Sequence, residues 1–374
     1  MSTPGLLDDD VKLASLRRIS PSRYNSLREC ALREVLVSKR QAPLLPVSPA
    51  AAIGSAIHSL LEEAGKGALP GINDISSRWE KLVDTLNEKL SKSWLDSYCV
   101  PLSKTVRDYD FKKLRAIRKA AEIHSTMQLY DNVVAASRHE LWVQSGDGFL
   151  GGAIDIADVT AEGTVLRDYK SGQIYEGDEI KPAYKLQLKL YAALYKEMVG
   201  EWPIALQIEP LKGQSVDVPF TRDECTALFV EALSLFHEIN QQVSSLQGET
   251  THSESMRSLA NPSRQVCQFC QFRPVCGPYL RERRAERADD WPADMLGKVI
   301  EITALKNGKL LIGIEDSHGA TYLRGVTNSV DRHPALAFLK LSDWIGVFGV
   351  MRSPAADTFS ESVQTVIYKY LYDP

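Results

Sequence analysis

The chain has 374 residues, 44% of them apolar and 25% charged, which is ordinary for a soluble globular protein with room for two domains. A net charge of −4 excludes a generally basic nucleic-acid-coating surface, so any contact with phosphate must come from local patches. The first residues carry no secretory signal and no apolar run is long enough to cross a bilayer, so we expect a cytoplasmic protein without membrane contact.

The first third of the chain is predicted to be helical after a flexible arm at residues 1–20. Helix capping and apolar periodicity predict helices over 20–37, 51–65, 74–98 and 108–130, with a Pro-rich loop at 41–50.

The pattern then changes to short β-branched or aromatic segments separated by turn residues. Strands are predicted over 138–144, 151–159, 163–170 and 204–211, with helices over 182–200 and 221–246. Helices, a strand meander, a helix and a further strand indicate a mixed α/β core.

From Trp291 onward the pattern is almost entirely β. Five strands are predicted, over 297–304, 309–315, 320–326, 343–350 and 363–372, with a short helix at about 334–341 and an Asn-Gly turn in "KNGK". This order favours a small C-terminal all-β OB-like barrel, with an SH3-like barrel as the alternative. We therefore expect two domains, 1–288 and 291–374.

Two acids and a lysine lie in the predicted strands "GGAIDIADV" and "GTVLRDYK". Alternation places Asp168 and Lys170 on one face of their strand, and a hairpin through "TAEGT" would bring Asp155 beside Asp168. Two carboxylates can hold Mg²⁺ or Mn²⁺ against a phosphate, and a nearby lysine can orient water and balance negative charge. An exposed hairpin with weak surface ion pairs is the structural alternative, and the pattern alone favours it.

The surrounding motifs decide between these readings. "GSAIH", "GAIDIAD…DYKSG" and "QLKLYAALY" follow one another in an order that resembles the RecB-like branch of the PD-(D/E)xK nucleases, with their restriction-endonuclease-like core and a helical insertion. The resemblance implies that Asp155, Asp168 and the Tyr169 carbonyl hold the metal, with His58 as a further ligand or substrate contact. It implies that Lys170 is the catalytic lysine.

The same resemblance implies that Gln187 and Tyr191 are a helical Q-x-x-x-Y motif that positions Lys170 or the DNA strand. Considered alone, His58 is expected to be a core histidine, and Gln187 and Tyr191 are expected to lie on a helix surface. Glu140 is a further acidic candidate, although a solvated strand edge explains it equally well.

Three cysteines follow the spacing C-x2-C-x5-C at Cys267, Cys270 and Cys276, and a soft-ligand site needs a fourth ligand, for which Cys30 is our choice. Residue chemistry alone leaves zinc and iron–sulfur open. The arrangement resembles that of AddB-type and CRISPR-associated relatives, which implies a structural [4Fe–4S] cluster. Cys99 and Cys225 are interpreted as ordinary buried residues.

Candidate surfaces for DNA are local. They are the basic stretch 104–119, the segment "RERRAER" at 281–287, and the barrel residues Tyr322, Arg324, Trp344 and Phe348, although a charged helix face or a barrel core explains each of them too.

The sequence therefore predicts a metal-dependent nuclease for single-stranded or end-containing DNA. A catalytically silent DNA-binding or scaffolding subunit is the alternative. The chain has no G-x-x-x-x-G-K-[ST] motif. The resemblance implies a separate helicase or assembly partner and a role in DNA repair, CRISPR adaptation or antiviral defence.

Overall fold

The computed structural model describes residues 5–7, 13–38, 42–69, 71, 74–130, 138–246, 255–285, 291–355 and 357–371. Among these residues, no helix combines the length and apolarity needed to cross a bilayer.

A five-stranded sheet organises the N-terminal part of the chain, and its strands are those the sequence predicts, with one short addition. Its order is β2-β3-β4-β7-β8. The strands are β2 (Arg138–Gln144), β3 (Gly151–Val159), β4 (Thr164–Lys170), β7 (Ala205–Pro210) and β8 (Val216–Asp217). β4 and β7 are parallel, whereas the other neighbours are antiparallel. A parallel pair needs a crossover, and α7 (Pro182–Val199) provides it. A short hairpin, β5 (Tyr175–Glu176) with β6 (Glu179–Ile180), precedes this helix.

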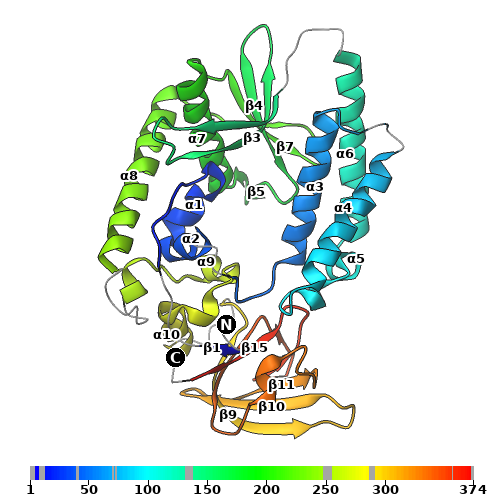
Figure 1. Ribbon diagram of the computed structural model, residues 1–374, viewed down its shortest axis with the longest axis vertical. Helices are drawn as coiled ribbons and strands as arrows, with labels where there is room; N and C mark the ends of the chain where they lie inside the picture. Colours follow the sequence, from blue (N-terminus) through cyan, green and yellow to red (C-terminus); the bar gives the residue numbers. More distant parts are fainter. Residues whose placement is uncertain are drawn as a thin grey trace.

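Two groups of helices extend from this sheet toward the C-terminal sheet at the other end of the molecule (Figure 1). The first group packs around α7 and contains α1 (Pro21–Glu29), α2 (Ala31–Ser38) and α8 (Arg222–Leu246). The second is the helical insertion, with α3 (Pro49–Gly65), α4 (Asp74–Ser91), α5 (Leu102–Thr105) and α6 (Tyr109–Tyr130).

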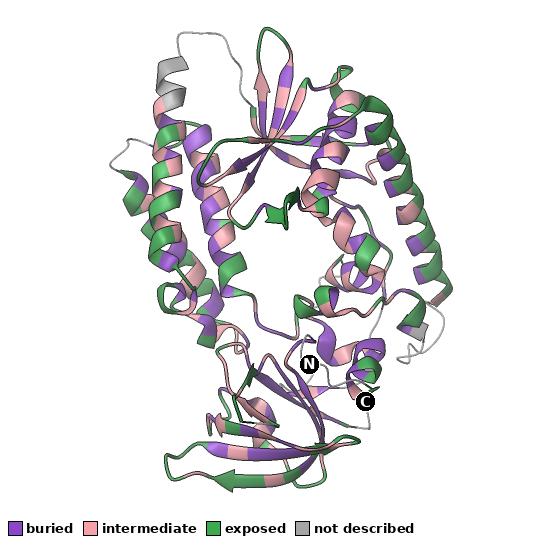
Figure 2. Ribbon diagram, turned by 180° about the vertical axis from the view of Figure 1, so that it is seen from behind, coloured by how far each residue is buried: buried purple, intermediate pink, exposed green. Residues whose placement is uncertain are grey.

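Each helical group has its own hydrophobic core. Leu166, Leu194 and Leu206 belong to the core around α7. Ile156 and Tyr169 instead pack with the insertion helices. Figure 2 shows the long helices with buried residues along one side and exposed residues along the other, as expected for amphipathic helices that cover a sheet.

The C-terminal part is an eight-stranded sheet with the order β1-β15-β12-β9-β10-β11-β14-β13. Its strands are β1 (Leu6–Leu7), β9 (Met295–Ala304), β10 (Leu310–Asp316), β11 (Gly319–Val326), β12 (Trp344–Phe348), β13 (Met351–Arg352), β14 (Thr358–Ser360) and β15 (Val366–Tyr370). All five predicted strands are present. The predicted helix at 334–341 is only a short 3₁₀ helix, η4 (Pro334–Ala337).

The expected OB-like barrel is not confirmed. Within the described residues the strand order is open, because β1 and β13 lie at opposite ends of the sheet and do not pair with each other. Two short strands that the sequence did not reveal extend one end, since β14 pairs with β11 and β13 pairs with β14.

The N-terminal segment also differs from the predicted arm. Leu6 and Leu7 pair in parallel with Lys369 and Tyr370, so these two residues join the C-terminal sheet. A two-residue strand has no periodicity to detect, and only its distant partner defines it. The predicted boundary between the domains, at about 288–291, lies mostly in residues 286–290, outside the described residues.

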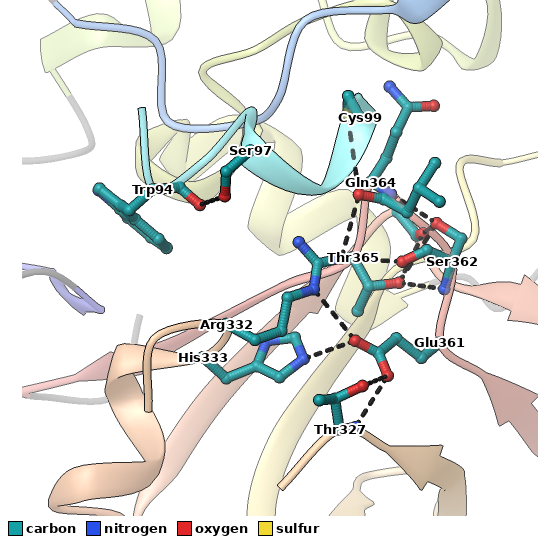
Figure 3. A network of polar contacts seen from close by, with 12 residues as sticks. Trp94, Ser97, Cys99, Thr327, Arg332, His333, Glu361, Ser362, Gln364 and Thr365 are labelled. Carbon is teal, nitrogen blue, oxygen red and sulfur yellow. Dashed lines mark hydrogen bonds and ion pairs between the residues drawn. The ribbon is translucent and has the colours of Figure 1, made fainter. Parts of the chain in front are cut away.

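A polar network fixes the C-terminal sheet against the helical insertion (Figure 3). Glu361 accepts hydrogen bonds from Thr327, Arg332 and His333 at 2.8–3.1 Å. The Arg332 guanidinium also lies 4.2 Å from the ring centroid of Tyr98, which belongs to the insertion. The carbonyl of Val47, which precedes α3, accepts a bond of 3.4 Å from Gln364 Nε2. The two parts of the chain are thus joined by specific contacts as well as by apolar packing.

Candidate active site

A local distortion in two paired strands places Asp155 at the boundary between the two cores. His139 pairs with Ile156 and Leu141 with Ile154, so the register puts Glu140 opposite Asp155. Glu140 has a φ of 54°, a left-handed conformation that is unfavourable for a residue with a Cβ and is often found at functional sites. Ile154 packs in the core around α7 and Ile156 in the core of the insertion, so Asp155 lies between residues of the two cores.

Asp155 and Asp168 lie close together, as the sequence predicted. The backbone N–H of Tyr169 donates to Asp155 Oδ2 at 2.7 Å, which joins β3 to the residue after Asp168. The two carboxylate side chains are only 15% and 5% exposed. Burial, followed by the nearby negative charge of Asp168, raises the pKa of Asp155. Two buried acids that disfavour each other's charge form a site that a cation would stabilise.

Lys170 and Gln187 complete a closed set of contacts with Asp168. Gln187 Nε2 donates to Asp168 Oδ1 at 2.6 Å, and Gln187 Oε1 accepts from Lys170 Nζ at 3.1 Å. Lys170 also forms an ion pair with Asp168. The ammonium lies 4.7 Å from the ring centroid of Tyr184, a residue that the sequence reading missed and that one helical turn separates from Gln187. Gln187 therefore holds both the acid and the lysine in place.

Tyr191 and His58 border the same group from two different helices. Tyr191 is buried one turn after Gln187, and a Cβ on Gly152 would lie 3.0 Å from its hydroxyl. The glycine before Asp155 thus allows β3 to approach α7 closely. His58 Nδ1, on α3, lies 3.9 Å from Asp155 Oδ2. Burial lowers the pKa of His58, which favours the neutral imidazole that a metal ligand requires.

These residues line one cleft of about 520 Å³. Its walls are formed by Arg18, Ser20, Ser22, Arg23, His58, Trp142, Gly151, Gly152, Ala153, Asp155, Asp168, Lys170, Gln187 and Tyr191. It therefore gathers all the predicted catalytic side chains and His58, with Tyr169 adjoining through its backbone. The notable residues that the sequence reading missed are Arg18, Arg23 and Trp142. Glu140 is half-buried and does not line the cleft.

The donors fit a hard divalent cation. Two carboxylates supply oxygen, the ligand type that Mg²⁺ and Mn²⁺ prefer, and such ions normally keep several waters, so a third acid is not needed. The described residues contain no group of three or more His, Cys, Asp or Glu side chains already arranged to hold a metal ion. A cation held by Asp155 and Asp168 would lie in the same cleft as the ammonium of Lys170.

Comparison with known proteins agrees with this geometry. A family model described as the PD-(D/E)XK nuclease superfamily matches residues 18–277, which include the whole cleft. The chain belongs to the PD-(D/E)XK nuclease superfamily. Members of this superfamily are generally nucleases that use divalent metals such as Mg²⁺.

Other comparisons add little to the superfamily assignment. No curated protein matches the chain. One solved structure, described as "Crystal structure of SSO0001", is 13% identical, with a TM-score of 0.23, over 45% of this chain and 77% of that one. The superfamily assignment of this chain thus rests on the family match and on the residues of its cleft.

The four cysteines of the predicted cluster converge from the two ends of this superfamily domain. Cys30 lies between α1 and α2, Cys267 lies in α9 (Arg264–Gln268), and Cys276 precedes α10 (Gly277–Ala285). Burial raises the pKa of the Cys276 thiol, and the nearby sulfurs of Cys270, Cys30 and Cys267 raise it further. These four residues are not among any preformed metal-binding groups of the described residues, so the cluster is not confirmed.

Contacts between backbone segments explain why Cys30 meets the distant cysteine loop. The N–H of Leu32 donates to the carbonyl of Leu259 at 2.8 Å, and Asn261 Nδ2 donates to the carbonyl of Glu29 at 3.0 Å. Cys99 and Cys225 are buried elsewhere, and burial raises the pKa of each to about 11, as expected for inert thiols.

A buried arginine, which the sequence reading missed, organises the cysteine loop. Arg273 Nη1 donates to the carbonyls of Cys267 and Cys270 at 3.0 and 2.9 Å. Its Nε donates to Asp294 Oδ2 at 2.7 Å, and the other Asp294 oxygen accepts from the N–H of Gly349 at 2.8 Å. The cysteine loop is therefore connected through one ion pair to the C-terminal sheet.

The predicted DNA-binding surfaces are only partly available. In 104–119, Lys113 pairs with Glu80 and Lys119 with Glu209. In 281–287, Arg283 is buried, and residues 286 and 287 lie outside the described residues. Phe348 is fully buried, so its proposed contact with DNA is wrong and it belongs to the apolar packing. The remaining barrel candidates keep some exposure, although Trp344 has the Arg284 guanidinium 4.7 Å from its ring.

Proposed function

We propose that this protein is a Mg²⁺- or Mn²⁺-dependent DNA nuclease that hydrolyses phosphodiester bonds in single-stranded or end-containing DNA. The observation that carries the proposal is the convergence of Asp155, Asp168 and Lys170 in one cleft with Gln187 between the last two. A surface hairpin with incidental ion pairs would not bury its acids or share them with a glutamine from another element.

The residues have separate roles in this proposal. Asp155, Asp168 and the carbonyl of Tyr169 hold the divalent cation, with His58 as a further ligand or substrate contact. The cation supplies positive charge at the scissile phosphate when it is bound. Lys170 orients the attacking water and balances the charge that develops on the phosphate oxygens. Gln187 fixes Lys170, and Tyr191 packs behind this pair.

The same fold with a silent site would instead be a scaffolding subunit. A cleavage assay on a 5′-labelled single strand with Mg²⁺ or Mn²⁺ separates the two functions. Lys170→Ala is expected to reduce the cleavage rate at least a hundredfold, whereas Lys185→Ala, which breaks an exposed ion pair with Glu179, leaves the rate unchanged. Metal-dependent cleavage that survives Lys170→Ala would refute the assignment of this site.

We also propose that Cys30, Cys267, Cys270 and Cys276 hold a structural [4Fe–4S] cluster, with a zinc ion as the alternative. The support is their convergence from distant positions and the hydrogen bonds by which the buried Arg273 holds the loop in which three of them lie. Iron, sulfide and zinc analysis of anaerobically purified protein distinguishes the two. Cys270→Ser should lose the metal and Cys225→Ser should keep it; equal metal content in both would refute the proposal.

We further propose, from the resemblance noted in the sequence, that the protein works with a separate helicase or assembly partner. The processes proposed for it are DNA repair, CRISPR adaptation or antiviral defence. Pull-down with the purified protein tests for such a partner, and no retained motor protein is the result that would count against it.

A further inference from the structure

The cleft has an aromatic side chain that the proposed hydrolysis does not use. Trp142 lies on β2, at the edge of the five-stranded sheet, and is 43% exposed although it lines the cleft. Trp142 pairs with Ala153, which lies two residues before Asp155. The side chains of Trp142 and Asp155 therefore originate about 7 Å apart along the strand direction. Nearly half of the Trp142 surface therefore stays in contact with water beside a polar site.

The orientation of this ring is fixed by its neighbours. Trp142 Nε1 donates to Gln144 Oε1 at 3.2 Å, and the guanidinium of Arg18 lies 4.5 Å from the ring centroid. Arg18 also lines the cleft and, in the described part of the chain, no carboxylate forms an ion pair with it. The indole is thus held by two contacts, and the positive charge of Arg18 remains available to an anion.

A tryptophan face and an unpaired arginine together match the chemistry of an unpaired nucleotide. The base stacks on the face of the indole that Arg18 does not cover, and an adjacent phosphate meets the guanidinium. A base paired within a duplex cannot reach such a platform without leaving its stack. Arg23 also lines the cleft but already pairs with Glu34 at 2.7 Å, so Arg18 is the cation expected to contact the strand.

We propose that Trp142 and Arg18 form a platform that binds one unpaired nucleotide next to the scissile phosphate and so selects single-stranded DNA. This inference rests on the proposed function, because it assigns the substrate form of the same cleft. Trp142 acts here as a specificity-determining residue, and Arg18 both orients the indole and contacts phosphate.

Binding measured without cleavage tests the platform independently of the nuclease activity. In the Lys170→Ala background with Mg²⁺, fluorescence anisotropy of a labelled single strand should show about tenfold weaker binding for Trp142→Ala and near-normal binding for Trp142→Phe. Phe269→Ala is the control, since Phe269 is a 74% exposed aromatic in the cysteine loop, outside the cleft and outside the candidate DNA-binding surfaces. An oligonucleotide made of abasic sites should bind equally well to Trp142→Ala and to the protein that keeps Trp142, because it has no base to stack.

Arg18 is tested by the salt dependence of the same binding. Loss of one phosphate contact should reduce the slope of log K against log [salt] by about 0.7 in Arg18→Ala. Unchanged single-strand affinity in Trp142→Ala, or equal losses on normal and abasic strands, would overturn the platform. If Trp142→Ala weakens single-strand binding as expected but the protein with its cleft unchanged never cleaves DNA, only the proposed hydrolysis is refuted.

Discussion

The ion pair between Arg273 and Asp294 should be the most stability-critical polar contact between the cysteine loop and the C-terminal sheet. The Asp294 side chain is fully buried and that of Arg273 only 8% exposed, so neither charge can regain water if its partner is lost. Asp294 also accepts from the hydroxyl of Tyr279 at 2.6 Å and from the N–H of Gly349 at 2.8 Å. Asp294→Ala removes all these acceptors and leaves the guanidinium buried without its counter-charge.

Removing one partner of a buried ion pair costs about 3–5 kcal/mol, and we expect a loss of that size in the free energy of unfolding of Asp294→Ala. Urea denaturation measures it. Glu179→Gln is the control, because Glu179 is 82% exposed and its ion pair with Lys185 contributes at most about 1 kcal/mol.

A second variant separates the charge from the packing. Replacing both partners with apolar residues, as in Arg273→Met with Asp294→Leu, should recover part of the lost stability, since no charge is then left unpaired. If Asp294→Ala unfolds within 1 kcal/mol of the unchanged protein, the network does not join the two parts of the chain as described.

Three further predictions concern single contacts. Hydrogen bonds, led by that from His333, outweigh burial and lower the pKa of Glu361 to about 2. The Glu361 carboxylate therefore stabilises the fold fully above pH 4.5 and loses this effect as the pH falls toward 2. Glu361→Gln should destabilise the protein by about 2 kcal/mol at pH 7, and this difference should shrink between pH 4.5 and 2 when it is measured by urea denaturation. Gly152→Ala should destabilise the protein by about 1–3 kcal/mol and slow cleavage, because its Cβ would press on the hydroxyl of Tyr191; thermal unfolding equal to that of the unchanged protein would contradict this. Gln187→Ala should reduce kcat by about 10- to 100-fold with an unchanged circular dichroism spectrum, since it frees the lysine of the site, and an unaltered kcat would refute that positioning role.

The sequence predicted the local elements and the proximity of the candidate site residues well, because both depend on short-range patterns. Alternation within one strand places Asp168 and Lys170 together, and helical spacing places Gln187 beside Tyr191. The structure brings these residues into one cleft with Asp155.

Features that depend on distant partners were not predictable in this way. The strand at Leu6 and Leu7 is defined only by its pairing with β15. Arg273 would be predicted from the sequence to be a surface charge, because nothing local indicates its ion pair with Asp294. The left-handed conformation of Glu140 likewise has no signal in its own residue type, because glycine or asparagine would be expected there.

Metal binding measured directly tests the central claim, which is that Asp155 and Asp168 hold one divalent cation. Titration of the protein with Mn²⁺, followed by electron paramagnetic resonance, should reveal a site that is lost in both Asp155→Ala and Asp168→Ala. Asp158→Ala is the control, since this aspartate lies on the same strand as Asp155 but outside the cleft and should leave binding intact. Mn²⁺ binding that survives the loss of either cleft aspartate would contradict the account.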